Sequence, residues 1–226
     1  MSLIVKICGL STPEALEAAL QAGADMVGFV FFPASPRNIS LETARALGAR
    51  VRGRATKVAL TVDADDAVLD AVVAALRPDM LQLHGKELPA RVWALKKHFG
   101  LPVMKAIALE TKSDLSAIET YATLADRLLF DARPPRQATR PGGLGKSFEW
   151  HLLEHIEPGV PFMLSGGLNA DNVGEALRIT RAPGVDVSSG VERAPGEKDP
   201  QKISAFVGAA RDAAERLAGE SMASPG

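Results

Sequence analysis

Cysteine is almost absent from this chain, because Cys8 is the single example among 226 residues. One cysteine rules out an internal disulfide and a metal cluster built from several thiolates, and it fits a reducing compartment. Long apolar runs are absent too, since no uninterrupted stretch approaches the roughly 18 residues of a membrane span. The opening residues MSLIVKICG hold an apolar run too short and wrongly flanked for a signal peptide. We therefore expect a cytoplasmic globular protein with no membrane partner.

The chain also lacks an excess of charge of either sign. Its 26 basic and 27 acidic residues give a net charge of −1, with an isoelectric point near 6.4. Without a broad basic field, the protein is not expected to bind nucleic acid or a membrane surface. Apolar residues are plentiful, and their 46% share supplies enough surface for a sizeable core.

Short apolar runs alternate with amphipathic stretches along the whole chain. The runs with strand character are 3–8, 25–31, 56–62, 79–85, 102–107, 127–132, 161–167 and 184–190. The stretches with helical character are 11–23, 40–48, 65–76, 87–100, 113–123, 148–155, 169–180 and 200–217. In the first of these, Ser11 and Glu14 are expected to form a capping box, with Pro13 in the first turn and Gly23 as the stop.

About eight strand–helix units of roughly 25 residues match a (β/α)8 barrel in size and order. The sequence therefore predicts an α/β protein, a single TIM barrel over residues 1–217, followed by a frayed tail over 218–226. A doubly wound open sheet is the alternative, although it usually has fewer units and does not close.

Polar residues gather where the expected strands end, which is where barrels of this type build their active sites. They are Cys8, Arg37, His84, Lys105, Asp131, Asp186, Ser188 and Ser189. Lys6 and Cys8 are two residues apart and so face the same side of a strand, into the barrel. A lysine there is expected to favour the thiolate of Cys8.

Two glycine-bearing turns, LSGGLNADNV at 164–173 and VSSGVE at 187–192, follow the last two strands. Loops in these positions commonly bind a phosphate through backbone N–H groups, and glycine lets the backbone approach an anion closely. Neither turn matches a Walker A or dinucleotide fingerprint, so those nucleotide pockets are not indicated. The segment 131–147 is long, basic and rich in proline and glycine. It fits a mobile lid over a phosphate ester and a solvated connector equally well.

Each polar residue also has a structural interpretation. Cys8 could be an inert core residue, and His84 could hydrogen-bond a turn. Asp131 could pair with an arginine of its own loop, and Lys6 and Lys105 could form an internal ion network with Asp186. Burying so many charges is costly without a use for them, however, and nearly all of them fall at strand ends. Together they favour an active site.

The motifs resemble those of the phosphoribosylanthranilate isomerase family along nearly the whole chain. The matching segments are KICGL at Lys6, GFVFFPASPR at Gly28, LQLHGKE at Leu81, MKAI at Met104, LLFDA at Leu128, GGLGKSFEW at Gly142, LSGGLNADNV at Leu164 and GVDVSSGVERAPGEKD at Gly184. The family performs an Amadori rearrangement of a phosphoribosyl amine in tryptophan biosynthesis, without cofactor or metal. The resemblance therefore implies a small phosphosugar substrate, and it implies that neither a cofactor nor a metal ion is needed.

The resemblance also implies roles for individual residues. Cys8 would be the general base and Asp131 the general acid, which would have to hold a proton at pH 7. Arg37 would bind the anthranilate carboxylate, and Asp186 would hold the anthranilate amine or sugar hydroxyls. Lys6 and His84 are further substrate-binding candidates. The phosphate would lie on Gly166, Gly167, Ser188, Ser189 and Gly190.

Three other functions fit the sequence less well. A histidine-pathway sugar isomerase uses an aspartate where this chain has Cys8, and it tends to show phosphate turns in both halves of the barrel. A pentose-phosphate epimerase needs metal-binding histidines at strand ends, where only His84 is found. A silent phosphosugar-binding protein would not need both Cys8 and Asp131. A monomer or a weak homodimer is expected.

Overall fold

The computed structural model describes residues 3–133, 138, 140–145 and 147–223. Eight parallel strands close into a barrel in sequence order, and β1 pairs with both β2 and β8. The barrel strands are β1 Ile4–Cys8, β2 Met26–Phe31, β3 Thr56–Thr61, β4 Met80–Leu83, β5 Val103–Leu109, β6 Arg127–Ala132, β7 Phe162–Leu164 and β8 Gly184–Val187. The predicted (β/α)8 barrel is therefore confirmed.

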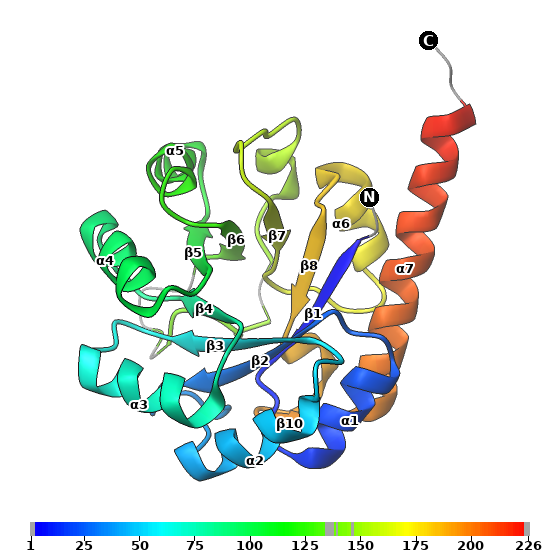
Figure 1. Cartoon of the computed structure of the whole chain (residues 1–226). Helices are drawn as coiled ribbons and strands as arrows, with labels where there is room; N and C mark the ends of the chain where they lie inside the picture. Colours follow the sequence, from blue (N-terminus) through cyan, green and yellow to red (C-terminus); the bar gives the residue numbers. More distant parts are fainter. Residues whose placement is uncertain (1–2, 134–137, 139, 146, 224–226) are drawn as a thin grey trace.

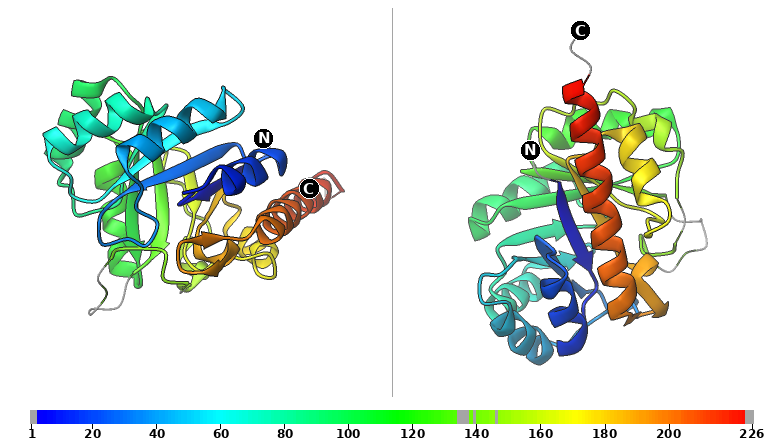
Figure 2. Two further views of the ribbon diagram at one scale, coloured as in Figure 1. Left: turned by 90° about the horizontal axis from the view of Figure 1, so that it is seen from below. Right: turned by 90° about the vertical axis from the view of Figure 1, so that its right-hand side faces the viewer.

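Helices surround the barrel, as Figure 1 shows. They are α1 Pro13–Gln21, α2 Leu41–Val51, α3 Asp66–Leu76, α4 Pro89–Phe99, α5 Ser116–Ala122, α6 Val173–Thr180 and α7 Pro200–Ala223. Three 3-10 turns complete the helical segments: η1 Lys112–Leu115, η2 Trp150–Leu153 and η3 Ser189–Val191. The long helix α7 contacts α1, α6 and β1, and so closes the ring of helices where the barrel itself closes (Figure 2). No helix in the described part of the chain combines the length and apolarity needed to cross a bilayer.

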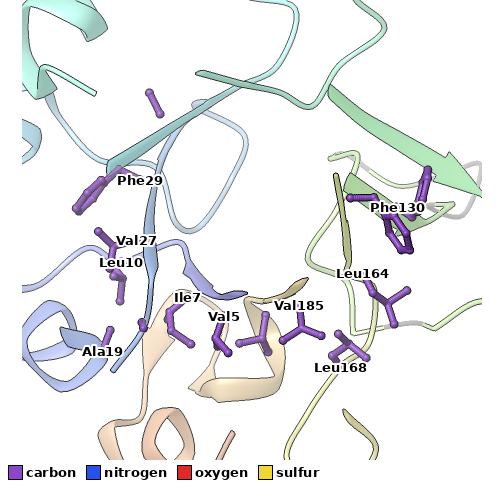
Figure 3. Packing of buried hydrophobic residues seen from close by; sticks show 14 of the residues in the cluster. Val5, Ile7, Leu10, Ala19, Val27, Phe29, Phe130, Leu164, Leu168 and Val185 are labelled. Atoms are coloured by element: carbon purple, nitrogen blue, oxygen red, sulfur yellow. The ribbon is translucent and has the colours of Figure 1, made fainter. Parts of the chain in front are cut away.

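The main hydrophobic core lies between the strands and the helices. Strand residues such as Val5, Ile7 and Val27 pack there against Leu10 and Ala19 of the first loop and helix (Figure 3). The alternate side chains point into the barrel, where Met26, Met80, Met104 and Met163 belong to a second buried cluster. A third, small cluster of Cys8, Val30 and Leu60 lies nearer the carboxyl ends of the strands. Arg127, at the amino end of β6, buries part of its guanidinium, so polar groups are found at both ends of the strands.

Three local predictions were wrong. The cap of α1 is Thr12 rather than Ser11, and its hydroxyl accepts from the Ala15 N–H at 3.2 Å. The helix expected over 148–155 is only the turn η2, which ends at Leu153 because the backbone is already extended at Glu154. The predicted fold also omitted a hairpin of β9 (Glu192–Ala194) and β10 (Glu197–Lys198), whose strands are too short to show alternation.

The last helix also extends further than expected. It continues to Ala223, whereas the sequence pattern ended it near Leu217, and residues 224–226 lie outside the described residues. Small and charged residues such as Ala218 and Glu220 are compatible with a helix even without an apolar face to bury. The division of the chain into a barrel of 217 residues and a tail stays a prediction.

Candidate active site

One cavity opens at the carboxyl ends of the barrel strands and brings together most of the predicted site residues. Its lining includes Cys8, Arg37, His84, Asp131, Gly166, Gly167, Asp186, Ser188 and Ser189. Lys6 and Gly190 are not part of this lining, although both lie directly behind residues that are. Residues that are up to 181 positions apart in the sequence thus share one space.

Cys8 ends β1 with its side chain in the cavity wall, where it is only 4% exposed. Gly28 on the neighbouring strand makes room for it, since a Cβ there would lie 2.9 Å from Sγ and 3.2 Å from the Lys6 Nζ. Burial raises the pKa of the Cys8 thiol, while the Lys6 and Lys198 ammonium groups act in the opposite direction without overcoming it. Lys6 therefore favours the thiolate, as expected, but desolvation outweighs it and the net shift of the thiol pKa is upward.

This protonation state predicts how Cys8 reacts with iodoacetamide. Only the thiolate is alkylated. The alkylation rate should therefore be slow at pH 7 and should still rise above pH 9, which is the ordinary pKa of a thiol. Deprotonation of Lys198 would push the thiol pKa higher still. Because Cys8 is the only cysteine, mass spectrometry of the intact protein measures the rate directly. A rate that levels off below pH 8 would contradict a raised pKa.

Lys6 is held beneath the cavity rather than in it. Its Nζ donates to the Asp186 Oδ1 at 2.7 Å, and the side chain is completely buried. Burial alone would lower the pKa of Lys6, but Asp186 and Cys8 raise it above its ordinary value, so the ammonium stays charged. The other oxygen of Asp186 accepts from the Ser165 hydroxyl at 3.1 Å. Lys6 thus acts on the cavity through Asp186 and Cys8.

Asp131 ends β6 opposite Cys8, and its carboxylate is held at both oxygens. The Ala132 N–H donates to Oδ1 at 2.8 Å, and His84 Nε2 lies 3.1 Å from Oδ2. The Gly142 backbone passes close above, because a Cβ there would lie 2.6 Å from Oδ2 and 2.8 Å from the His84 Nε2. The arginine pairing considered for Asp131 is not found among its described partners, and the histidine takes that place.

Arg37 reaches the cavity from the loop after β2, and its guanidinium is already paired. Its Nε and Nη2 donate to the two Glu192 carboxylate oxygens at 2.7 and 2.8 Å, and Nη2 also donates to the Gly143 carbonyl at 3.1 Å. The Arg37 side chain also fills the space beside Gly9, where a Cβ would lie 2.5 Å from the Arg37 Cδ. Gly9 therefore leaves room for the Arg37 side chain.

Glu192 and Lys198, both in the β9–β10 hairpin, were missed by sequence reasoning. The Lys198 Nζ donates to the Glu192 Oε1 at 2.7 Å and to the Ser188 carbonyl at 2.8 Å. Burial lowers the pKa of Lys198 to about 8, and Glu192 opposes that fall. Burial acts against the charge of Glu192 too, but Arg37 and Lys198 keep its pKa below the ordinary value. The alternating charges in VERAPGEKD were the one available signal.

The two glycine turns lie side by side at the mouth of the cavity. Gly166 and Gly167 have left-handed φ values of 86° and 67°, which favour glycine. Gly190 packs against the first turn, because a Cβ there would lie 1.9 Å from the Leu168 carbonyl oxygen. Ser188 donates to the Cys8 carbonyl at 3.0 Å and so joins the second turn to the end of β1. The geometry provides a concave backbone surface with two serine hydroxyls.

Lys105, the remaining strand-end residue, does not belong to the cavity. Its Nζ donates to Glu87 at 3.0 Å and to the carbonyls of Leu83, Gly85 and Ala106. The ion network expected between Lys105 and Asp186 is therefore wrong for Lys105 and correct only for Lys6. The side chain instead fixes the loop after β4.

The expected lid over 131–147 falls partly on residues 134–137, 139 and 146, which lie outside the described residues. Its described part lies over the cavity, since Pro141, Gly142, Gly143 and Leu144 contribute to the lining. Among the described residues, no three His, Cys, Asp or Glu side chains are grouped so that they could hold a metal ion.

Barrels of this architecture with titratable side chains around one cavity at the strands' carboxyl ends are enzymes. The family model described as N-(5'phosphoribosyl)anthranilate (PRA) isomerase matches residues 5–209. The chain belongs to this family.

Curated relatives and solved structures indicate the same family. The N-(5'-phosphoribosyl)anthranilate isomerase of Nitrobacter hamburgensis is 67% identical over 94% of this chain and 95% of its own length. The isomerase of Bradyrhizobium diazoefficiens is 65% identical over 96% of this chain and 99% of its own length. The crystal structure of phosphoribosyl anthranilate isomerase from Thermotoga maritima is 34% identical with a TM-score of 0.83, and covers 93% of this chain and 99% of that one. A second isomerase structure was solved with reduced 1-(o-carboxyphenylamino)-1-deoxyribulose 5-phosphate. It is 32% identical with a TM-score of 0.79, and covers 93% of this chain and 99% of that one.

Proposed function

We propose that this isomerase of tryptophan biosynthesis converts N-(5′-phosphoribosyl)anthranilate into 1-(2-carboxyphenylamino)-1-deoxyribulose 5-phosphate, with Asp131 as general acid and Cys8 as general base. The observation that carries the assignment is the placement of these two side chains at the ends of β6 and β1, in the wall of one cavity. An Amadori rearrangement needs one group that gives a proton and another that takes one.

The first step uses Asp131. Its O–H protonates the furanose ring oxygen, which takes the electron pair of the breaking C1′–O bond, and the ring opens to a positively charged Schiff base. The hydrogen bonds from His84 and the Ala132 N–H favour this step, because they are aimed at the carboxylate that forms.

The second step uses Cys8. Its thiolate takes the proton from C2′, the electrons of that C–H bond neutralise the Schiff base, and the resulting enolamine tautomerises to the ketone. The raised pKa of Cys8 means that the free protein holds a thiol. The positive charge created by ring opening lowers that pKa, since an opposite charge nearby favours the thiolate. The thiol proton then passes to solvent water, which leaves the thiolate free to take the proton from C2′.

The ends of the substrate have separate binding groups in this proposal. Arg37 takes the anthranilate carboxylate through the part of its guanidinium not used by Glu192. Asp186 and His84 face the middle of the cavity, and the turns with Gly166, Gly167, Ser188, Ser189 and Gly190 take the phosphate. Lys6 contributes through Asp186. A cytoplasmic monomer or weak homodimer is proposed, although a Thermotoga maritima relative is described as dimeric.

Turnover of the purified protein tests the proposal. Phosphoribosylanthranilate is fluorescent, and its fluorescence should be lost at an enzyme-dependent rate in buffer without added metal. The histidine-pathway aminoaldose serves as the comparison substrate. A well-folded protein that leaves phosphoribosylanthranilate unchanged would overturn the proposed activity, and preference for the comparison substrate would reassign it.

A further inference from the structure

Behind the acid Asp131 lies a buried line of polar groups that reaches from β4 to β6. The Gln82 Nε2 lies 3.0 Å from the His84 Nδ1, and the His84 Nε2 lies 3.1 Å from the Asp131 Oδ2. Gln82 is completely buried, and the side chains of His84 and Asp131 are 10% and 7% exposed. Gln82 and His84 are two residues apart, so both side chains point into the barrel.

The direction of these hydrogen bonds fixes the tautomer of the histidine. A protonated Asp131 could donate to a bare Nε2, so that the group facing Nδ1 decides the tautomer, whereas an ionised Asp131 can only accept and requires the proton on Nε2. A neutral imidazole then has a bare Nδ1, which accepts from the Gln82 amide N–H. The recorded contact through the Gln82 Nε2 agrees with this direction. The Gln82 Oε1, although buried, has no hydrogen-bond partner among the described residues, so His84 is the contact that orients the amide.

The tautomer determines where the proton of Asp131 can point. With Nε2–H toward it, Oδ2 accepts from His84, and a protonated Asp131 must aim its O–H elsewhere, into the cavity. With the proton on Nδ1 instead, a bare Nε2 would accept the Asp131 O–H and turn it toward β4 and away from a substrate. Glutamine at position 82 supplies the donor that selects the first arrangement.

Four charged groups near the pair have their own partners, whereas the Arg140 Nε is buried without one among the described residues. On β5, Lys105 is directed to Glu87 and loop carbonyls, and on β8, Asp186 is paired with Lys6. Asp63, in the loop after β3, accepts a hydrogen bond from the Lys86 N–H. Arg133, directly after β6, pairs with Glu110 and Asp114. Cys8 and Arg140 share the cavity lining with the pair. Among the described residues, Gln82 is thus the polar side chain that hydrogen-bonds His84 from behind.

We propose that Gln82 is a positioning residue for the acid: it holds His84 as the Nε2–H tautomer, which keeps the Asp131 proton directed at the substrate. The proposal rests on the proposed function for the meaning of that proton, but the tautomer itself is a property of the free protein.

The variant Gln82→Glu tests this by reversing the hydrogen bond. A carboxylate can only accept from Nδ1–H, so at neutral pH His84 should adopt the opposite tautomer and kcat should fall at least tenfold with little change in KM. The carboxylate also stabilises a second proton on the imidazole. At lower pH the imidazolium donates from both nitrogens, so the kcat of this variant should recover as pH falls, whereas the wild-type rate should not.

Nitrogen-15 NMR of the imidazole rings gives an independent reading in the wild-type protein. Only four histidines are present, and His98, His151 and His155 are exposed, so His84 stands apart as the buried ring. We expect a neutral Nε2–H tautomer in the wild type. A wild-type His84 protonated at Nδ1 would overturn the proposal, and so would a Gln82→Glu enzyme with wild-type kcat and pH profile.

A second variant keeps the test decisive if the buried glutamate prevents folding. Gln82→Met keeps the size of the side chain but leaves Nδ1 without a donor, so NMR should show both tautomers and kcat should fall severalfold. Unchanged NMR signals and kcat in this variant would contradict the proposal. If the wild-type tautomer is confirmed but the protein does not turn over phosphoribosylanthranilate, the proposed activity fails and the positioning of His84 stands.

Discussion

Replacing Cys8 by alanine is expected to lower kcat for phosphoribosylanthranilate by at least about 100-fold, the usual scale for an acid–base residue. The thiolate is the only group at the end of β1 that can take the C2′ proton, and its neighbours Val30 and Leu60 are apolar. The alanine variant should still open the furanose ring, because Asp131 is untouched. KM should change little, since the groups proposed to bind the carboxylate and the phosphate, Arg37 and the glycine turns, are left in place.

Two controls separate lost chemistry from lost structure in that variant. Removing one buried sulfur should cost only about 1 kcal/mol of stability, so the thermal unfolding midpoint should shift by a few degrees at most. Cys8→Ser keeps the size of the side chain but replaces the thiol by a hydroxyl, which is a much weaker acid. The kcat of this variant should be nearly as low as that of Cys8→Ala. A Cys8→Ala enzyme that keeps most of its kcat would show that another group is the base.

Replacing Asp131 by asparagine is expected to reduce kcat by a similar factor for a different reason. The asparagine oxygen can still accept from His84 or from the Ala132 N–H, so the local hydrogen bonds are largely kept. The amide cannot give up a proton to the ring oxygen, so ring opening becomes the slow step. Kinetics with a large excess of enzyme should then show that no ring-opened intermediate accumulates.

Asp63→Asn is the matched control for that substitution. Asp63 lies at the end of the neighbouring β3–α3 loop, and its carboxylate accepts from the Lys86 N–H, which an asparagine oxygen can also do. Its positive φ of 47° is tolerated by asparagine. The control should keep nearly the full rate. Equal losses of kcat in both variants would indicate a general effect of lost charge and contradict the role of Asp131.

The barrel and the position of its site could be predicted because both follow from local patterns. Apolar runs with both faces covered predicted buried parallel strands, and the residues just after those runs predicted the mouth of the barrel. Cys8, Asp131 and Asp186 were found in this way without knowledge of their contacts.

The partners of those residues could not be predicted, because they come from distant parts of the chain. The Arg37–Glu192 pair joins residues 155 positions apart, and nothing in either local sequence indicates the other. The net direction of the Cys8 pKa shift could not be predicted for a related reason. The sequence shows that Lys6 is close, but the cost of burying the thiol depends on Gly28, Val30 and Leu60 packing around it.

The Arg37–Glu192–Lys198 contacts also determine how late in synthesis the cavity can be completed. Chains emerge from the ribosome at about 5–20 residues per second, amino terminus first. Arg37 is therefore made well before the β9–β10 hairpin that pairs with it, and β1 waits for β8 before the barrel closes. A nascent chain that ends before residue 192 has no carboxylate to hold Arg37 in place. The substrate anchoring proposed for Arg37 is consequently among the last properties the growing chain acquires.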